Sequence, residues 1–108
     1  MRKGDSVELK MEKVLRAEDT KDKAAYACTV LGYDMGRECV CLLLETGNLT
    51  DISLDAIYSC QIQSEEEQIS CTGRICDRYH GKAGKIIEFQ IKSGFYKINL
   101  KSVDKHIT

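Results

Sequence analysis

The sequence predicts an all-β fold, a small antiparallel β-barrel of about six or seven strands. Three observations support this fold class: segments with alternating apolar and polar residues recur along the chain, no segment has the spacing of a strong amphipathic helix, and the chain contains no proline. Alternation with a period of two is typical of strands that bury one face. Closing such strands into a barrel removes exposed sheet edges, and the short connections favour that closure.

Length and charge set the limits of this interpretation. At 108 residues the chain has the length of one domain, which we assign to residues 1–108. Its 16 basic and 17 acidic side chains leave a net charge of -1, so no overall positive field would attract nucleic acid. There is no apolar segment of about twenty residues for a membrane span and no signal peptide. We therefore expect a cytoplasmic protein whose six cysteines stay reduced and pack as small apolar groups.

The N-terminal half contains the first three predicted strands. Residues 7–12 alternate strictly, and the charged run 16–23 after them is expected to be a solvated loop. Residues 25–33 and 37–45 then form a hairpin around a glycine-containing turn at 34–36. The second arm is apolar on both faces, with one set formed by Cys39, Cys41 and Leu43 and the other by Val40, Leu42 and Leu44.

This two-sided arm predicts an interaction surface. A barrel has one interior, so only one set of side chains can fill it, and leaving the other in water would forgo roughly 1.5 to 3 kcal/mol per side chain. We expect Val40, Leu42 and Leu44 to form the outer face, covered by a chain terminus, by another protein or by a second copy in a homodimer. Because the termini are charged, a protein partner or a homodimer is favoured.

The C-terminal half supplies the remaining strands. An alternating segment at 56–62 is followed by a charged hairpin tip and by a return strand at 69–75. Gly73, in the middle of that strand, indicates a bulge or a tight bend. The last segments alternate on either side of Lys92-Ser93-Gly94, and the tight turn predicted there separates two strands, at 87–91 and 96–100.

A polar stretch precedes the strand at 56–62. Asp51 to Ala56 reads DISLDA, and an Asp followed two residues later by a Ser is a good turn former through side-chain to backbone hydrogen bonds. The stretch also resembles the DxSxxG signature of PilZ-type β-barrels, with Ala56 where that family has glycine. Gln68 to Gln90 is similar to the strands that follow this signature. The opening GDSVELK is similar to the related N-terminal domain of YcgR-type flagellar-brake proteins.

The resemblance implies a site for a nucleotide ligand. PilZ domains are bacterial receptors for cyclic diguanylate (cyclic di-GMP), in which the Asp and Ser of the signature, here Asp51 and Ser53, touch the guanine base. An RxxxR pair upstream of the signature grips the phosphates, and no such pair precedes DISLDA here. Arg74 and Arg78 have that spacing but follow the motif, and on a regular strand both would project to the same face. They are strand-surface arginines or an alternative anion site.

The other chemistry-bearing residues form no recognisable catalytic or metal site. The cysteine pairs 39–41 and 71–76 lack the two-residue spacing of structural zinc sites, so no metal and no cofactor is predicted. Neither histidine lies in a recognisable base motif near a nucleophile, so the chain is not expected to be an enzyme. Basic side chains gather around the glycine-containing loop 77–85, which is either a solvated loop or a ligand-binding rim.

We therefore predict a cytoplasmic, non-catalytic, PilZ-like β-barrel that acts as a regulatory or protein-interaction module in signalling and does not bind cyclic di-GMP. The missing arginine pair favours this interpretation, because phosphate pairing carries much of the affinity for such ligands. Two alternatives stay open. One is a cyclic di-GMP receptor. The other is a small nucleic-acid-binding barrel, for which five tyrosines and two phenylalanines offer a thin stacking platform.

Overall fold

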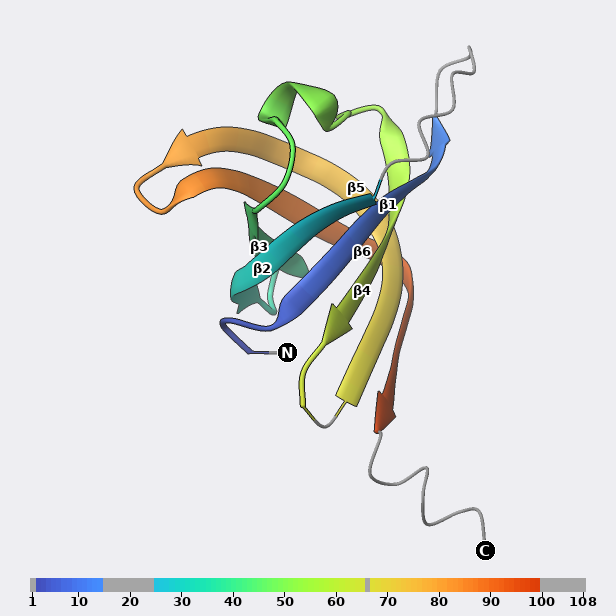
Figure 1. The fold of residues 1–108 in the computed structure, drawn as a ribbon. Helices are drawn as coiled ribbons and strands as arrows, with labels where there is room; N and C mark the ends of the chain where they lie inside the picture. The colour runs from blue at the N-terminus through green and yellow to red at the C-terminus, as the bar shows by residue number, and fades with distance from the viewer. Residues whose placement is uncertain (1, 15–24, 66, 100–108) are drawn as a thin grey trace, which may run out of the picture.

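The computed structural model describes residues 2–14, 25–65 and 67–99, which form a closed antiparallel barrel (Figure 1). The elements in chain order are β1 (Ser6–Val14), β2 (Ala25–Asp34), β3 (Cys39–Leu44), the 3₁₀-helix η1 (Leu49–Asp51), β4 (Ala56–Gln63), β5 (Glu67–Gly81) and β6 (Gly84–Asn99). Around the barrel the order is β1-β2-β3-β6-β5-β4, and β4 pairs with β1 to close it. The predicted small all-β barrel is confirmed.

The alternation in the sequence separates the inside of the barrel from its outside. Leu9 on β1, Tyr58 on β4 and Phe89 on β6 point inward and have no solvent exposure. Each such side chain stabilises the fold by about 1.5 to 3 kcal/mol relative to its exposure in water. No charged side chain among the described residues is buried. The interior is therefore an apolar core that holds no charged side chain of the described residues.

The strand β6 is continuous where the sequence analysis placed a turn. It runs through Lys92-Ser93-Gly94 and stays paired with β5, Ser93 lying opposite Thr72 and Tyr96 opposite Ser70. The register between β5 and β6 shifts on both sides of Thr72. These shifts are bulges, which bend the two strands together without ending either strand. The predicted turn is therefore wrong, and the described residues form six strands, within the six or seven predicted.

Gly73 confirms the bulge or bend predicted for β5. A Cβ atom at this position would overlap the carbonyl oxygen of Gln90 and would lie 2.9 Å from its carbonyl carbon and 3.0 Å from Cζ of Phe89. The register of β5 against β6 shifts between Thr72 and Gly73. Only glycine allows the β6 backbone to approach this closely, so Gly73 fixes the tight bend of the long hairpin.

The inner and outer faces of β3 are the reverse of the prediction. Val40 and Leu42 are fully buried and Leu44 is 3% exposed, and all three belong to the barrel core. The predicted interaction face is therefore wrong. Because both sets of side chains are apolar, alternation groups them correctly but does not tell which group faces inward. The register decides it, since Leu42 lies opposite the buried Val30 and Ile87. The outer side of β3 carries Cys39, Cys41 and Leu43.

Two other predictions concern residues outside the described ranges. The charged run 16–23, expected to be a solvated loop, lies entirely outside the described residues. Position 100, the end of the last predicted strand, also lies outside them. Within the described ranges, no helix has the length and apolar character needed to cross a membrane.

Candidate functional site

The DISLDA stretch forms a loop that is held by its own polar side chains. Asp51 Oδ2 accepts a hydrogen bond from the backbone N–H of Asn48 at 3.0 Å, and Ser53 Oγ accepts one from the N–H of Asp55 at 3.0 Å. The N–H of Ser53 donates to Tyr58 Oη at 2.9 Å. Asp51 and Ser53 thus act as the turn formers that their spacing indicates.

Apolar packing and two cations anchor this loop to the barrel. Ile52 is fully buried and belongs to the core cluster. The Arg78 guanidinium donates from Nη1 to the carbonyl oxygens of Leu49, at 2.9 Å, and of Ile52. Lys85 Nζ donates to the carbonyl oxygen of Gly47 at 2.6 Å. In Figure 1, η1 lies above the arms of the β5–β6 hairpin that carry these two cations.

Arg74 and Arg78 do not share a face, contrary to the expectation for a regular strand. Ile75 pairs with Phe89 and Asp77 pairs with Glu88, so Cys76 is the extra residue of a bulge. The bulge reverses the alternation. Arg74 is exposed on the outer side, while Arg78 lies opposite the buried Ile87 and reaches the loop at the barrel end. The structure therefore brings Arg78 to the loop of Asp51 and Ser53 and leaves Arg74 elsewhere.

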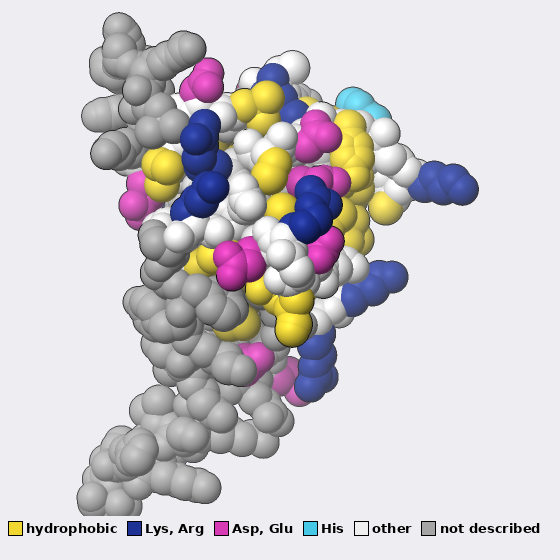
Figure 2. All heavy atoms as spheres, turned by 180° about the vertical axis from the view of Figure 1, so that it is seen from behind, with side chains coloured by type: hydrophobic (Ala, Val, Ile, Leu, Met, Phe, Trp, Pro, Cys, Tyr) yellow, Lys and Arg dark blue, Asp and Glu magenta, His cyan; other side chains and the backbone are white. Residues whose placement is uncertain are grey.

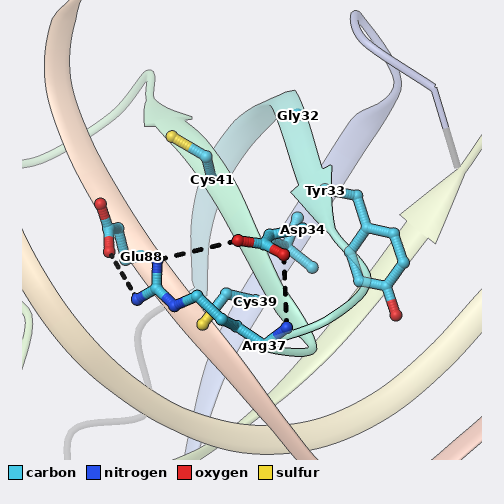
Figure 3. A pocket seen from close by; sticks show the side chains of 8 residues that line it. Gly32, Tyr33, Asp34, Arg37, Cys39, Cys41 and Glu88 are labelled. Carbon is cyan, nitrogen blue, oxygen red and sulfur yellow. Dashed lines mark hydrogen bonds and ion pairs between the residues drawn. The ribbon is translucent and has the colours of Figure 1, made fainter.

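A groove on the outer side of the barrel was not predicted from the sequence (Figure 3). It encloses about 260 Å³ and is lined by Gly32, Tyr33, Asp34, Arg37, Cys39, Val40, Cys41 and Glu88. The hollow arises partly at Gly32, where a Cβ atom would have no atom within 4 Å. A bulge in β2 between Val30 and Gly32 places this glycine opposite Cys41.

Opposite charges meet at the rim of the groove. The Arg37 guanidinium lies 3.9 Å from Asp34 Oδ2 and 3.7 Å from Glu88 Oε1. Figure 3 shows it between the two carboxylates. The Arg37 side chain is 62% exposed, so these ion pairs contribute little to stability.

An apolar row continues from the groove across three strands. The register places Leu43 of β3 opposite Ile86 of β6, and Ile86 opposite Tyr79 of β5. Ile86 is 5% exposed but lies outside the main core cluster, whereas Tyr79 is 38% exposed. We call Cys41, Leu43, Tyr79 and Ile86 the outer patch. Its sequence signal is the doublet Ile86-Ile87, because adjacent apolar residues in a strand cover both faces.

The edge of the outer patch is polar. Tyr79 Oη donates to Glu88 Oε2 at 3.0 Å, and this hydrogen bond raises the pKa of Tyr79. Glu88 therefore touches both the tyrosine and Arg37. Figure 2 shows the molecule from behind. Apolar surface runs beside a histidine, and a basic side chain lies among carboxylates nearby.

The sequence led us to expect that all six cysteines would be buried, and this prediction is wrong for two of them. Cys28, Cys39, Cys60 and Cys71 are buried, Cys41 is half-buried and Cys76, at the β5 bulge, is exposed. Burial raises the pKa of Cys41, and Glu88 raises it further. In the part of the chain that the structure describes, no three His, Cys, Asp or Glu side chains are grouped to hold a metal ion.

No protein-family model matches this chain, and neither a curated protein nor a solved structure matches it. The resemblance to PilZ barrels stays a prediction. Function is therefore inferred from the loop, the groove and the outer patch of this chain itself.

Proposed function

We propose that this chain is a non-catalytic, PilZ-like protein-interaction module that pairs with a second copy of itself through the outer patch. The observation that carries this proposal is the apolar row of Leu43, Ile86 and Tyr79, which crosses three strands on the outside of the barrel. Ile86 packs there apart from the main core. Leu43 is half-buried and Tyr79 is 38% exposed, so covering these two side chains removes apolar surface from water, which favours association.

Charge complementarity supports a second copy as the occupant. The groove beside the outer patch carries both a cation, Arg37, and two carboxylates, Asp34 and Glu88. In a two-fold symmetric pair the same surface faces itself, so Arg37 of one copy can approach the carboxylates of the other. The net charge of -1 produces little repulsion between two copies.

The loop geometry supports a module that does not depend on cyclic di-GMP. The side-chain oxygens of Asp51 and Ser53 accept hydrogen bonds from backbone N–H groups of their own loop. Arg78, the arginine nearest to them, donates to loop carbonyl oxygens. A ligand would have to compete with these contacts for the groups that should recognise its guanine base and phosphates.

Sedimentation equilibrium tests the proposal. The wild type should form dimers at high micromolar concentration, and Leu43→Glu should yield a folded monomer because the added charge lies on the outer side of β3. Gln61→Glu is the matched control, since it introduces the same charge at an exposed position of β4. It should leave the dimer intact. A monomeric wild type at that concentration would contradict the proposal and would leave docking to a different protein.

A cyclic di-GMP receptor is the second candidate, favoured by the presence of Arg78 and Lys85 beside the DISLDA loop. Calorimetric titration of cyclic di-GMP separates the two. The interaction module should bind no tighter than about 100 μM, a level that unspecific phosphate contacts can reach. A sub-micromolar dissociation constant that Asp51→Ala abolishes would establish the receptor instead.

A further inference from the structure

Two thiols face each other inside the barrel. Cys60 of β4 and Cys71 of β5 are direct partners in the antiparallel register. Both side chains point inward, Cys60 without exposure and Cys71 with 3%. Each of the two thiols shifts the pKa of the other, as expected for side chains that lie close together. We propose that Cys60 and Cys71 are a redox site that closes into a reversible disulfide in the presence of a peroxide and crosslinks β4 to β5.

The register gives the geometry that a disulfide needs. Residues directly opposite each other in an antiparallel pair have Cα atoms about 4.5 or about 5.5 Å apart. Disulfides usually span Cα separations of roughly 4.4 to 6.8 Å. The pairs Ser59–Thr72 and Gln61–Ser70 continue the same register on both sides. The bond can therefore form without a shift of either strand.

The sheet order separates this pair from the other thiols. All six cysteines lie within the described strands. Cys28 is close enough to Cys60 to raise its pKa, but β1 lies between their strands β2 and β4. β6 also lies between Cys39 on β3 and Cys76 on β5, although these two thiols lie close enough for Cys76 to raise the pKa of Cys39. Strands two places apart are roughly 9 to 10 Å apart, which exceeds the span of a disulfide in an unmoved backbone.

The pKa values of the two thiols indicate which sulfur reacts first. The Cys60 thiol lowers the pKa of Cys71, although burial opposes this effect. The Cys71 thiol, together with burial, raises the pKa of Cys60. Cys71 is therefore the better nucleophile, because the thiolate is the reacting form.

The reaction balances with one peroxide molecule. The Cys71 thiolate attacks one peroxide oxygen, the O–O bond breaks, and the leaving hydroxide takes a proton to become water. The Cys60 thiol then attacks Cys71 Sγ of the sulfenic acid and gives up its proton to the departing oxygen, so that the S–O bond breaks and the second oxygen leaves as water. Two thiols and hydrogen peroxide thus give a disulfide and two waters. A dithiol reductant reverses the change.

Peptide mapping after peroxide treatment tests this site in the full chain. We would use the variant Cys41→Ser/Cys76→Ser, which removes the two accessible thiols and keeps the proposed pair. After peroxide, the free thiols are alkylated under denaturing conditions. Cleavage after Glu65 to Glu67 separates Cys60 from Cys71, and cleavage after Arg74 releases Cys71 in a short peptide. These two peptides should be joined, with a loss of two hydrogen atoms that a reductant restores.

Two further measurements complete the test. The disulfide should raise Tm by about 10 °C, since it restricts the unfolded hairpin. Cys28→Ala, which removes the neighbouring thiol, should leave the crosslink intact, whereas Cys60→Ala and Cys71→Ala should abolish it. The Cys41→Ser/Cys76→Ser variant, treated with peroxide while folded, is the parent protein of this test. The proposal is overturned if Cys60 and Cys71 of the parent can both still be alkylated after peroxide, or if Cys60 is joined to Cys28. The parent map alone decides this, even where an alanine variant does not fold.

Discussion

Arg78 Nη1 lies 2.9 Å from the carbonyl oxygen of Leu49, a residue 29 positions earlier in the chain. This bond exists because the bulge at Cys76 turns Arg78 toward the barrel end, where the loop of Asp51 and Ser53 closes. The Arg78 side chain, which meets the DISLDA motif at Ile52, is thus engaged in holding the loop backbone.

Arg78→Ala should destabilise the protein by about 2 kcal/mol, because hydrogen bonds with a charged group contribute about 1.5 to 3 kcal/mol. The loss should appear as a lower midpoint in urea denaturation. Arg74→Ala is the matched control, since that side chain is exposed on the same strand. It should change stability by no more than about 0.5 kcal/mol. Equal effects of the two substitutions would show that Arg78 does not anchor the loop.

Gly73→Ala should destabilise the barrel by roughly 3 kcal/mol or more, since the new methyl group would overlap the Gln90 carbonyl oxygen and strain the bent hairpin. Gly32→Ala provides the comparison. A Cβ atom there meets no atom within 4 Å, so this change should have little effect on stability. Thermal unfolding of both variants measures the difference. A stable Gly73→Ala variant would mean that β6 does not approach β5 as closely as described.

The native protein should show one rapidly reacting thiol, that of Cys76, which is exposed. Cys41 is half-buried and should follow more slowly. The four buried cysteines should react with a bulky aromatic disulfide only after denaturation, because a reagent of that size cannot reach their thiolates in the folded barrel. Titration with a chromogenic disulfide gives the number of thiols in each phase, and Cys76→Ser should remove the first phase. A fast phase that persists in this variant would count against the described burial.

Stability should fall as the pH rises above about 9, because burial raises the pKa of Cys28 from 9.0 to about 12. Between these values the unfolded chain has lost the proton and the folded chain keeps it. The free energy of unfolding therefore decreases by up to about 1.4 kcal/mol per pH unit from this thiol. Urea denaturation from about pH 8 to about pH 11 measures the slope. Cys28→Ala should flatten it by one thiol, and an unchanged slope would refute this assignment.

The barrel could be predicted because most strands alternate strongly between apolar and polar residues. The same rule failed at β3, where both faces are apolar and only pairing with β2 and β6 shows that Leu42 faces inward. The turn predicted at Lys92-Ser93-Gly94 was wrong for a different reason. A local turn signal there competes with continuous pairing to β5, and long-range pairing prevails.

The candidate site was harder to predict than the fold. The turn-forming role of Asp51 and Ser53 follows from their spacing alone. The position of Arg78 does not, because the bulge at Cys76 reverses the alternation without any glycine or proline to signal it. The outer patch joins residues from three strands, so it depends on a register that single-strand patterns do not contain.

The most direct test of the proposed docking surface is a comparison of backbone amide NMR spectra at low and high protein concentration. Pairing through the outer patch should shift the signals of Cys41, Leu43, Tyr79 and Ile86 as the concentration rises, while those of Asp51 and Ser53 stay constant. Leu43→Glu should remove the concentration dependence. Spectra of the wild type that do not change with concentration, or changes confined to the DISLDA loop, would contradict the account.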